Sequence, residues 1–321
     1  MTESGVYYPD GSFKGSAQIR VEALRAGEPI YHTRMPGETD FEFWQDEMMR
    51  RRDARIEYEG RPECVEIEIP TEKPVVIGQM GDNHIGGMYH AYELMGRHAN
   101  VIKEHPLFYV GFGGDLFEGF FFNPAQDKSL GSFYEERAHA RAMIDHIGND
   151  KILWACEGDH DMWEGKMGGN FYEDFQRKYE AYLLRGVSKI KLRLSSVDGN
   201  VDYSWVTAHR LPGFSMHNRL HPTFRASRFG VAGADIYGCY HTHKKALGYQ
   251  SYKTFDGTIH QLHFVPGPYK YDDDLAQKMG YGRLDEEDLG AIWIVLWPKQ
   301  KRMEGFKDIE GAIDRVAPYL D

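Results

Sequence analysis

From Pro74 onward, short runs of apolar residues alternate with stretches whose apolar residues recur at helical spacing. This alternation is typical of strand–helix–strand units, in which each apolar run forms a buried strand. The predicted strands are 75–77, 107–110, 152–155, 203–206, 236–237 and 291–297. The predicted helices are 88–103, 132–147, 171–185 and, near the end of the chain, 308–317. The pattern therefore predicts an α/β domain.

Residues 1–70 follow a different pattern, with turn-rich segments, a predicted helix at 39–53 and an alternating edge strand at 65–69. The helix ends in the basic run Arg50–Arg52. Because positive charge is favourable at a helix C-terminus, we prefer this interpretation of the run to a phosphate-binding patch. We expect three parts, which are an N-terminal extension over 1–70, a main domain over 71–300 and a C-terminal helix or tail over 301–321.

Composition narrows the class of protein. The 321 residues are 41% hydrophobic and 27% charged, a globular balance that excludes intrinsic disorder. The net charge of −11 argues against non-specific coating of nucleic acid. No run approaches the ~18 apolar residues of a membrane helix, and the N-terminus lacks a signal-peptide pattern. Three cysteines without paired spacing favour a reduced, cytoplasmic protein with no membrane contact, whose metal ligands would be nitrogen and oxygen.

Aspartate or histidine follows each of five predicted strands. The segments are Gly81-Asp82-Asn83-His84, Gly113-Gly114-Asp115, Gly158-Asp159-His160-Asp161, Thr207-Ala208-His209 and Tyr240-His241-Thr242-His243. In open α/β sheets, ligands bind at the carboxyl ends of the strands. Since neighbouring strands lie about 4.8 Å apart, these side chains are expected to surround one small volume.

The residue types suit metal-assisted chemistry. Carboxylates and imidazoles bind Mn, Fe, Zn or Ni, and Asp-x-His or His-x-His places both side chains on one side of an extended segment. Two ions about 3.5–4 Å apart stabilise phosphoryl displacement and activate water. Each motif alone is common, and a lone Asp-x-His is more often a capped turn. Their order after five successive strands makes a metal site the better interpretation.

This order of motifs resembles that of the calcineurin-like metallophosphoesterase superfamily, over roughly residues 74–245. The resemblance implies a four-layer αββα sandwich with a dinuclear metal centre at the strand ends. The main domain at 71–300 would then be the metallophosphoesterase domain.

The resemblance also implies a role for each motif residue. The first metal would be held by Asp82, His84 and His243, the second by Asp159, His209 and His241, and Asp115 would bridge the two. His160 would hydrogen-bond the substrate phosphate and protonate the leaving group, and Asp161 would orient His160 or its loop. A hydroxide bridging the two ions would attack phosphorus in line.

Two positions depart from the family pattern. Asp159 replaces the usual asparagine, which adds a negative charge near the expected phosphate. Tyr240 replaces a glycine, and a left-handed backbone there would be strained for tyrosine. Neither change removes a metal ligand, so both bear on substrate range and rate more than on the fold.

Several assignments keep an alternative. His209 directly follows a strand, so we prefer it to His217 as the lone histidine ligand. The segment 217–221 is then either a substrate loop, with His217 or Arg219 contacting a phosphate oxygen, or the start of a surface helix. Glu118 is expected to be a solvated loop residue, with contact to the ligands as the alternative. Residues 120–122 are expected to pack beneath a loop, with stacking on a nucleobase as the alternative.

The sequence favours a metal-dependent hydrolase of phosphoesters, of the phosphodiesterase or nuclease-like kind. A phosphomonoesterase or nucleotide pyrophosphatase of the same fold is the alternative, and a catalytically silent protein-binding scaffold is the third. Local support for nucleic acid comes from Arg50–Arg52 and from the basic strand-like segment 189–193. Mn is the expected ion, with Fe, Zn, Ni and Mg as alternatives. Residues 1–70 and 246–290 could form a cap or an oligomer interface, which leaves self-association through the extension open.

Overall fold

The computed structural model describes residues 5–7, 13–15, 41–59, 64–119, 129–163, 171–172, 178–179, 181–213, 215, 217–255, 257–271 and 284–320. The chain divides into two compact units, Met1–Arg61 and Pro62–Asp321. The first unit contains the antiparallel pair β1 (Gly5–Tyr7) and β2 (Phe13–Gly15) and the helix α2 (Phe41–Glu59).

Helix α2 continues past the basic run that was expected to end it. Arg50 and Arg51 pair with Glu47, at N–O distances of 2.9 and 2.7 Å, and Arg52 pairs with Asp53 at 2.7 Å. Ion pairs three and four residues apart stabilise a helix interior, so the arginines lie inside the helix and Glu59 ends it. The interpretation of this run as a C-terminal charge is therefore wrong.

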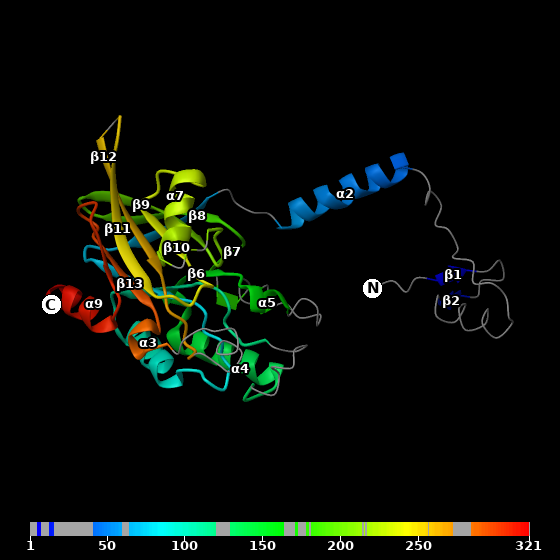
Figure 1. The fold of residues 1–321 in the computed structure, drawn as a ribbon, viewed down its shortest axis with the longest axis horizontal. Helices are drawn as coiled ribbons and strands as arrows, with labels where there is room; N and C mark the ends of the chain where they lie inside the picture. Colours follow the sequence, from blue (N-terminus) through cyan, green and yellow to red (C-terminus); the bar gives the residue numbers. More distant parts are fainter. Residues whose placement is uncertain are drawn as a thin grey trace. The chain divides into compact units, whose positions relative to one another are not determined.

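The second unit is built on two six-stranded sheets (Figure 1). The first sheet has the order β11 (Ala246–Thr254), β12 (Gly257–Val265), β10 (Ile236–Cys239), β9 (Gly199–Ala208), β8 (Ser188–Ser196) and β3 (Val65–Pro70). The second has the order β14 (Met303–Phe306), β13 (Ile292–Leu296), β4 (Val75–Met80), β5 (Phe108–Phe112), β6 (Ile152–Cys156) and β7 (Tyr182–Leu184). Strands β4 to β7 are parallel, and β9 is parallel to β10, so their carboxyl ends meet at shared edges.

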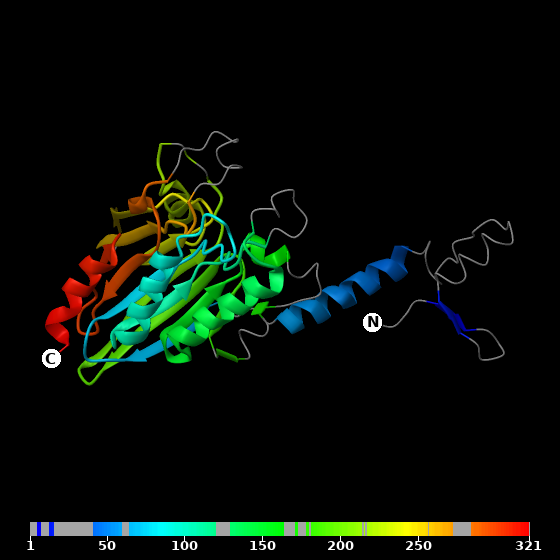
Figure 2. The same cartoon turned by 90° about the horizontal axis from the view of Figure 1, so that it is seen from below.

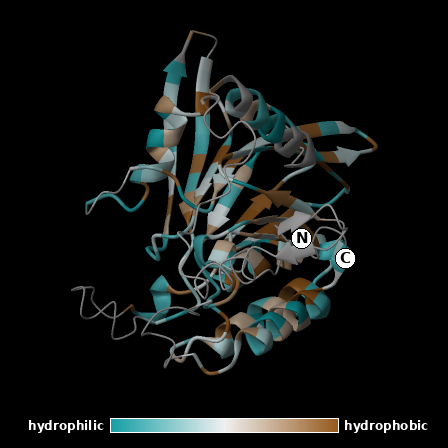
Figure 3. Ribbon diagram, turned by 90° about the vertical axis from the view of Figure 1, so that its right-hand side faces the viewer, coloured by the Kyte–Doolittle hydropathy of each residue, from teal (hydrophilic) through white to brown (hydrophobic). Residues whose placement is uncertain are grey.

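Strand β4 explains why the apolar runs are continuous rather than alternating. Val75 and Ile77 pack into the core between the two sheets, whereas Val76 and Met80 pack into a core beneath the helices. Both faces of such a strand are buried, which requires apolar residues at nearly every position. Figure 3 shows hydrophobic residues recurring along the strands, while the helix at the bottom of the view carries both hydrophobic and hydrophilic residues.

Helices cover the outer faces of both sheets. On the second sheet these are α3 (Tyr92–Glu104), α4 (Phe133–Ile147) and α9 (Ile309–Val316), which contribute to the core beneath them (Figure 2). On the first sheet, α7 (His221–Phe229) contacts β10 and β12. The layers are therefore helix, sheet, sheet and helix, which confirms the αββα sandwich. Among the described helices, none is both long and apolar enough to cross a membrane.

Three segments differ from the sequence-based expectations. Strand β3 pairs with β8 and lies in the second unit, although 1–70 was expected to be one extension. The predicted helix at 171–185 ends instead in β7, because Leu183 and Leu184 extend the parallel sheet beside β6. Residues 246–265, for which no strands were predicted, form the hairpin of β11 and β12 at one edge of the first sheet.

Candidate metal centre

The carboxyl ends of β4, β5, β6, β9 and β10 converge, and the predicted ligands lie in the segments that leave them. Asp82 and His84 follow β4, and Asp115 follows β5. Asp159 begins the short helix α5 (Asp159–Trp163) after β6. The three histidines that complete the set, His209, His241 and His243, follow β9 and β10.

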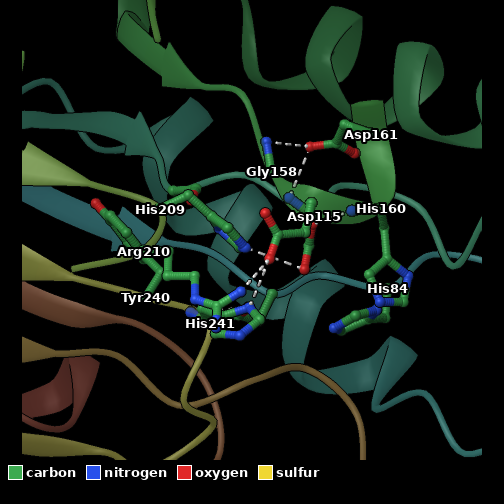
Figure 4. A network of polar contacts seen from close by, with 12 residues as sticks. His84, Asp115, Gly158, His160, Asp161, His209, Arg210, Tyr240 and His241 are labelled. Atoms are coloured by element: carbon green, nitrogen blue, oxygen red, sulfur yellow. Dashed lines mark hydrogen bonds and ion pairs between the residues drawn. The ribbon is translucent and has the colours of Figure 1, made fainter. Parts of the chain in front are cut away.

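Two groups of ligand atoms form at this edge. Asp82, His84 and His243 make the first cluster, and their ligand atoms all lie within 4.8 Å of one another. The second cluster consists of Asp115, His209 and His241, within the same distance (Figure 4). Each cluster offers one carboxylate and two imidazoles. The two clusters together fit a dinuclear metal site.

The two clusters are connected. The backbone N–H of His241, from the second cluster, donates to both carboxylate oxygens of Asp82, at 3.1 and 2.9 Å. Asp159 lies beside the second cluster, with its Oδ2 3.4 Å from His241 Nδ1. The backbone N–H of His160 donates to Asp115 Oδ1 at 2.8 Å. The groups that the family resemblance assigns to separate ions therefore contact one another.

Backbone strain is concentrated at these ligands. Among the described residues, positive φ values outside glycine occur at five positions, which are Asp82 (50°), His84 (49°), Asp115 (51°), His241 (65°) and His243 (54°). A left-handed conformation at such residues costs about 1–3 kcal/mol each, and it persists where the surrounding structure enforces it. All five positions belong to the two clusters, so the strain serves to aim ligand side chains.

Hydrogen bonds between the loops enforce this conformation. The backbone N–H of Asp82 donates to Gly114 O, and that of His84 donates to Asp115 O, both at 3.0 Å. The next amide, Ile85 N–H, donates to Leu116 O at the same distance. The loops after β4 and β5 therefore stay paired beyond the strands themselves.

Tyr240 does not have the strained left-handed backbone that was considered for it in the sequence analysis. It is absent from the positive-φ residues, and the left-handed positions are its neighbours His241 and His243. The tyrosine is fully buried, and its hydroxyl donates to Gln79 Oε1 at 2.8 Å. A Cβ atom at Gly81 or Gly113 would overlap the Tyr240 ring. The ring thus occupies the space that two glycines leave beneath the ligand loops.

Asp161 clamps the loops that carry Asp115 and His160. Its carboxylate accepts hydrogen bonds from the backbone N–H groups of Asp115 (2.7 Å), Leu116 (3.0 Å) and Gly158 (3.0 Å) (Figure 4). The Tyr172 hydroxyl donates to the same carboxylate at 2.5 Å. These four hydrogen bonds connect the loops that follow β5 and β6. The contacts of Asp161 are therefore with the loop backbone and Tyr172.

His160 lies at the side of the first cluster. Its Nδ1 is 2.5 Å from the carbonyl oxygen of Glu118, and because a carbonyl only accepts, Nδ1 is the protonated nitrogen. The ring stacks on Trp163 and meets His84 edge-on, with centroid distances of 4.4 and 4.7 Å. Nε2 points away from this contact.

The protonation of the histidines differs within each cluster. Burial lowers the pKa of His84 to about 4, in spite of the nearby Glu118 carboxylate. Burial alone would also lower the pKa of His209, but the Asp115 and Asp82 carboxylates raise it to about 10. In the same way the pKa of His243 is raised by Asp82, against the effect of burial, and that of His241 is lowered by burial.

The orientation of the ring nitrogens fits a cation. His209 Nδ1 lies 2.8 Å from Gly113 O and must donate to it, which turns Nε2 toward Asp115 Oδ2 at 3.2 Å. In the first cluster, the Nε2 atoms of His84 and His243 face each other at 3.1 Å. Lone pairs that converge in this way repel one another unless a proton or a metal ion lies between them. The donor set therefore suits divalent ions.

Glu118 is a correction to the sequence analysis, because it is buried rather than solvated. Its side chain is 3% exposed, and its Oε2 lies 3.3 Å from His84 Nδ1. Its Oε1 accepts a hydrogen bond from the ammonium of Lys270, which is also buried. Burial would raise the pKa of Glu118, but His84 and Lys270 lower it to about 2. No local motif around Lys270 signals this contact.

A second residue that the sequence analysis missed is Arg210. Its Nη1 lies 3.6 Å from Asp159 Oδ2 at the exposed side of the second cluster (Figure 4). The only signal in the sequence is its position directly after His209.

The remaining candidates lie elsewhere. His217 is exposed, and its backbone N–H approaches Ser215 Oγ at 3.3 Å. Arg219 pairs with Asp288 at 2.6 Å and donates to the Lys245 carbonyl at 3.1 Å. The segment 217–221 leads into helix α7, which begins at His221. Residues 120–122 lie outside the described residues.

Comparisons with known proteins give only structural likenesses. No family model and no curated protein matches the chain. It is similar to the phosphoesterase YfcE from E. coli, with 12% identity, coverage of 73% of this chain and 99% of that chain, and a TM-score of 0.34. Vacuolar protein sorting 29 from Cryptosporidium parvum has 11% identity, coverage of 74% and 100%, and a TM-score of 0.34. NAD nucleotidase from Haemophilus influenzae has 9% identity, coverage of 73% and 49%, and a TM-score of 0.34.

At these identities and TM-scores the likenesses carry no functional argument, and the site rests on the geometry of this chain. Two sheets between helix layers, with two carboxylate–histidine clusters at the strand ends, agree with the order of the sequence motifs. In fold, the chain resembles the calcineurin-like metallophosphoesterases.

Proposed function

We propose that this protein is a phosphoester hydrolase that uses two divalent metal ions. The observation that carries the proposal is the pair of three-residue clusters joined by the hydrogen bonds from His241 N–H to Asp82. Two adjacent ion sites of this kind suit the displacement of an alcohol from phosphorus, because the developing charge lies on oxygens that both ions can reach.

Each ion would have its own set of residues. Asp82, His84 and His243 would hold one, and His209 and His241 would hold the other. Asp115 would lie between the two ions, and Asp159 would complete the second set from its place beside His241. When bound, the ions supply activation of the attacking water and neutralisation of charge on the phosphoryl oxygens.

In its doubly protonated form, His160 would donate its Nε2 proton toward the phosphoryl group or the departing oxygen, while Nδ1 keeps its own proton in the bond to the Glu118 carbonyl. The bond from its Nδ1 to the Glu118 carbonyl supports this role, because it leaves Nε2 as the nitrogen that faces outward from that contact. Stacking on Trp163 restricts rotation of the ring. A positioned acid of this kind typically contributes about 10²–10⁴ in rate.

Mn is the ion that we propose, because sites with both carboxylate and imidazole ligands accept it, with Fe, Zn, Ni and Mg as alternatives. Affinity alone does not select Mn among these ions, so metal analysis of the purified protein is needed.

The substrate proposal begins with small phosphoesters. The prediction of a nuclease-like enzyme depended on two basic segments, and in these segments Arg50–Arg52, Lys191 and Arg193 have acidic partners. In the segment 189–193, Arg193 and Lys191 approach Asp202 at 2.8 and 3.3 Å, and Arg50–Arg52 pair within α2. A phosphodiesterase remains the sequence-based proposal, and a phosphomonoesterase is its competitor.

The test combines metal analysis with hydrolysis of bis-p-nitrophenyl phosphate and p-nitrophenyl phosphate, with and without added Mn²⁺. We expect close to two ions per chain and turnover that depends on them. The Asp115→Asn variant should lose both metal and activity, because it removes the carboxylate of the second cluster, which we propose is shared by both ions. His146→Ala is the matched surface control, since this exposed histidine on α4 contacts Asn100 and lies outside both clusters.

Full-length protein without bound metal and without turnover in excess Mn²⁺ would reject the proposal in favour of a silent scaffold. Two further predictions from the sequence are also proposals, namely a cytoplasmic location and self-association through the N-terminal extension. Fluorescence localisation and light scattering of the full-length chain would test them.

A further inference from the structure

The exposed side of the second cluster carries an arginine next to a carboxylate. Arg210 follows His209, and its side chain is 69% exposed, with Nη1 3.6 Å from Asp159 Oδ2. Asp159 is itself 30% exposed, whereas the side chains of Asp82 and Asp115 are almost fully buried. A molecule that enters from solvent therefore meets Asp159 and Arg210 before it reaches the deeper carboxylates.

The charges at this entrance matter for an anionic substrate. The carboxylates of Asp82, Asp115 and Asp159 lie in or beside the clusters, and each repels a phosphoryl group. The buried cation Lys270 is paired with Glu118 on the other side of the site. Arg210 instead places its positive charge on the exposed side, beside the one carboxylate that a substrate would meet first.

The guanidinium has donors to spare. It carries five N–H groups in a planar fork, and a single approach at 3.6 Å to Asp159 occupies one edge at most. Phosphoryl oxygens are well matched to such a fork, and hydrogen bonds between charged groups are stronger than neutral ones. Figure 4 shows the Arg210 side chain directed toward the clustered ligands, beside His241.

We propose that Arg210 is a substrate-binding residue that contacts the phosphoryl group and makes the site prefer a dianionic phosphoryl group, as in a phosphomonoester, over a monoanionic diester. Coulomb attraction to the guanidinium scales with the charge of the ligand, so the dianion gains more from it. Asp159 attracts the guanidinium to the exposed side of the second cluster. The inference rests on the proposed phosphoester hydrolase and names its substrate class.

The experiment compares Arg210→Ala with the wild-type protein, both loaded with Mn²⁺. Calorimetry measures the affinity for inorganic phosphate and for dimethyl phosphate, and steady-state kinetics measure kcat and KM for the two p-nitrophenyl esters. We expect phosphate affinity to fall and the monoester KM to rise by about 10- to 100-fold, the range for losing a hydrogen bond to a charged group. Dimethyl phosphate and the diester should change less, and metal content should stay the same.

Arg193→Ala is the matched control. It removes an arginine that pairs with Asp202 at 2.8 Å, on the part of β8 that lies opposite the beginning of β9 and away from His209. Its phosphate affinity should equal that of the wild type. A fall in this variant as large as in Arg210→Ala would overturn the inference, because it would show a general charge effect.

A double variant separates contact with the phosphate from simple neutralisation of Asp159. If Arg210 only offsets the charge of Asp159, then Asp159→Asn combined with Arg210→Ala should recover wild-type phosphate affinity, and the inference fails. If Arg210 contacts the phosphate, the double variant should remain weak, with metal content measured alongside.

The calorimetric measurement of phosphate binding does not depend on catalytic activity. A protein that binds phosphate through Arg210 but hydrolyses neither ester would therefore refute the proposed hydrolase and leave the phosphate contact standing. A metal-loaded wild type that does not bind phosphate would refute the contact.

Discussion

The two metal clusters share a ligand composition but differ in what supports them. In the first cluster, the outer nitrogen of His84 faces the carboxylate of Glu118, which is in turn bound to Lys270 deep in the protein. In the second, the outer nitrogen of His209 donates to the neutral carbonyl of Gly113, and the exposed side carries Asp159 and Arg210. One cluster is thus fixed by a buried ion pair, and the other is fixed by backbone and open to charged ligands.

This difference suggests that one cluster mainly holds its metal ion firmly and that the other mainly contacts the substrate. A carboxylate behind a ligand histidine fixes the ring orientation and increases its basicity. A carbonyl fixes the ring orientation without adding charge. The charge on the exposed side of the second cluster then depends on surface residues such as Asp159 and Arg210. We infer that the first cluster is the more rigid of the two and that an incoming substrate meets the second cluster first. Three measurements test this comparison.

The largest effect is expected from His160, whose ring contacts the first cluster and whose backbone contacts the second. His160→Ala should lower kcat by about 10²–10⁴, because it removes the proposed proton donor. Metal content should be retained, since the side chain is not among the clustered ligands. Steady-state kinetics with parallel metal analysis provide the measurement, and unchanged activity would end the assignment.

An intermediate effect is expected from Glu118, which supports only the first cluster. Glu118→Gln should weaken one of the two metal sites by about 10- to 100-fold, the usual cost of losing an outer partner of a ligand histidine. Titration with Mn²⁺ should then resolve one weak and one normal site. His263→Gln is a control with a buried histidine that contacts Tyr237 and Phe224 outside the clusters.

Equal weakening of both sites by Glu118→Gln would contradict the comparison between the clusters. Lys270→Met provides a second way to disturb the pair. It should act in the same direction, because it leaves the Glu118 carboxylate buried without its cation.

The smallest expected effect is a pH dependence of the stability of the metal-free fold, which comes from the protonation of His209 in the second cluster. Asp115 and Asp82 raise the pKa of His209 to about 10, above the value of about 6.5 expected in the unfolded chain. The proton on His209 therefore stabilises the metal-free fold fully below pH 6.5, and this contribution is lost as the pH rises through about 10. In the first cluster, His84 has the opposite shift, to about 4, so it is already neutral at pH 7, whereas the pKa of His243 is raised by Asp82 as that of His209 is.

Metal binding to the second cluster should accordingly displace the His209 proton. Below pH 10, its affinity should increase about tenfold for each pH unit and each proton released. Calorimetric titration with Mn²⁺ at pH 8, in two buffers of different ionisation enthalpy, measures the protons released. Binding without proton release would contradict the assignment of His209 as a ligand.

Much of the site could be predicted because it follows from local features. Asp82, Asp115 and His209 each follow a strand that the sequence shows as an apolar run. Where such runs alternate with helices, the carboxyl ends of the strands lie at one edge of a sheet, where ligands bind. The pairing of loops across that edge could not be predicted. The Glu118–Lys270 contact joins residues 152 positions apart, and nothing in either local sequence marks them as partners.

The fold divides in the same way. The apolar run at 152–155 and the helical spacing at 132–147 each carry their own signal, and both elements are present as β6 and α4. Strand β7 carries no such signal, because Leu183 becomes strand only through its hydrogen bonds to β6. The edge hairpin of β11 and β12 is another case, since its partly polar residues suit a sheet edge as well as a loop.

The sequence by itself determined the alternation of strands and helices, the order of the motifs and the residue types at the strand ends, because burial and turns act on neighbouring residues. The αββα layers were implied by the family resemblance and confirmed by the structure. Only the tertiary structure decided which side chains contact the outer nitrogens of the ligand histidines, which residues have a strained backbone, and which cation lies at the exposed side of the second cluster. The left-handed backbone at Asp82 and His241, for example, depends on bonds to loops that are remote in sequence. Long-range partners of this kind are chosen by the packing of the sheets, which brings distant loops to one edge.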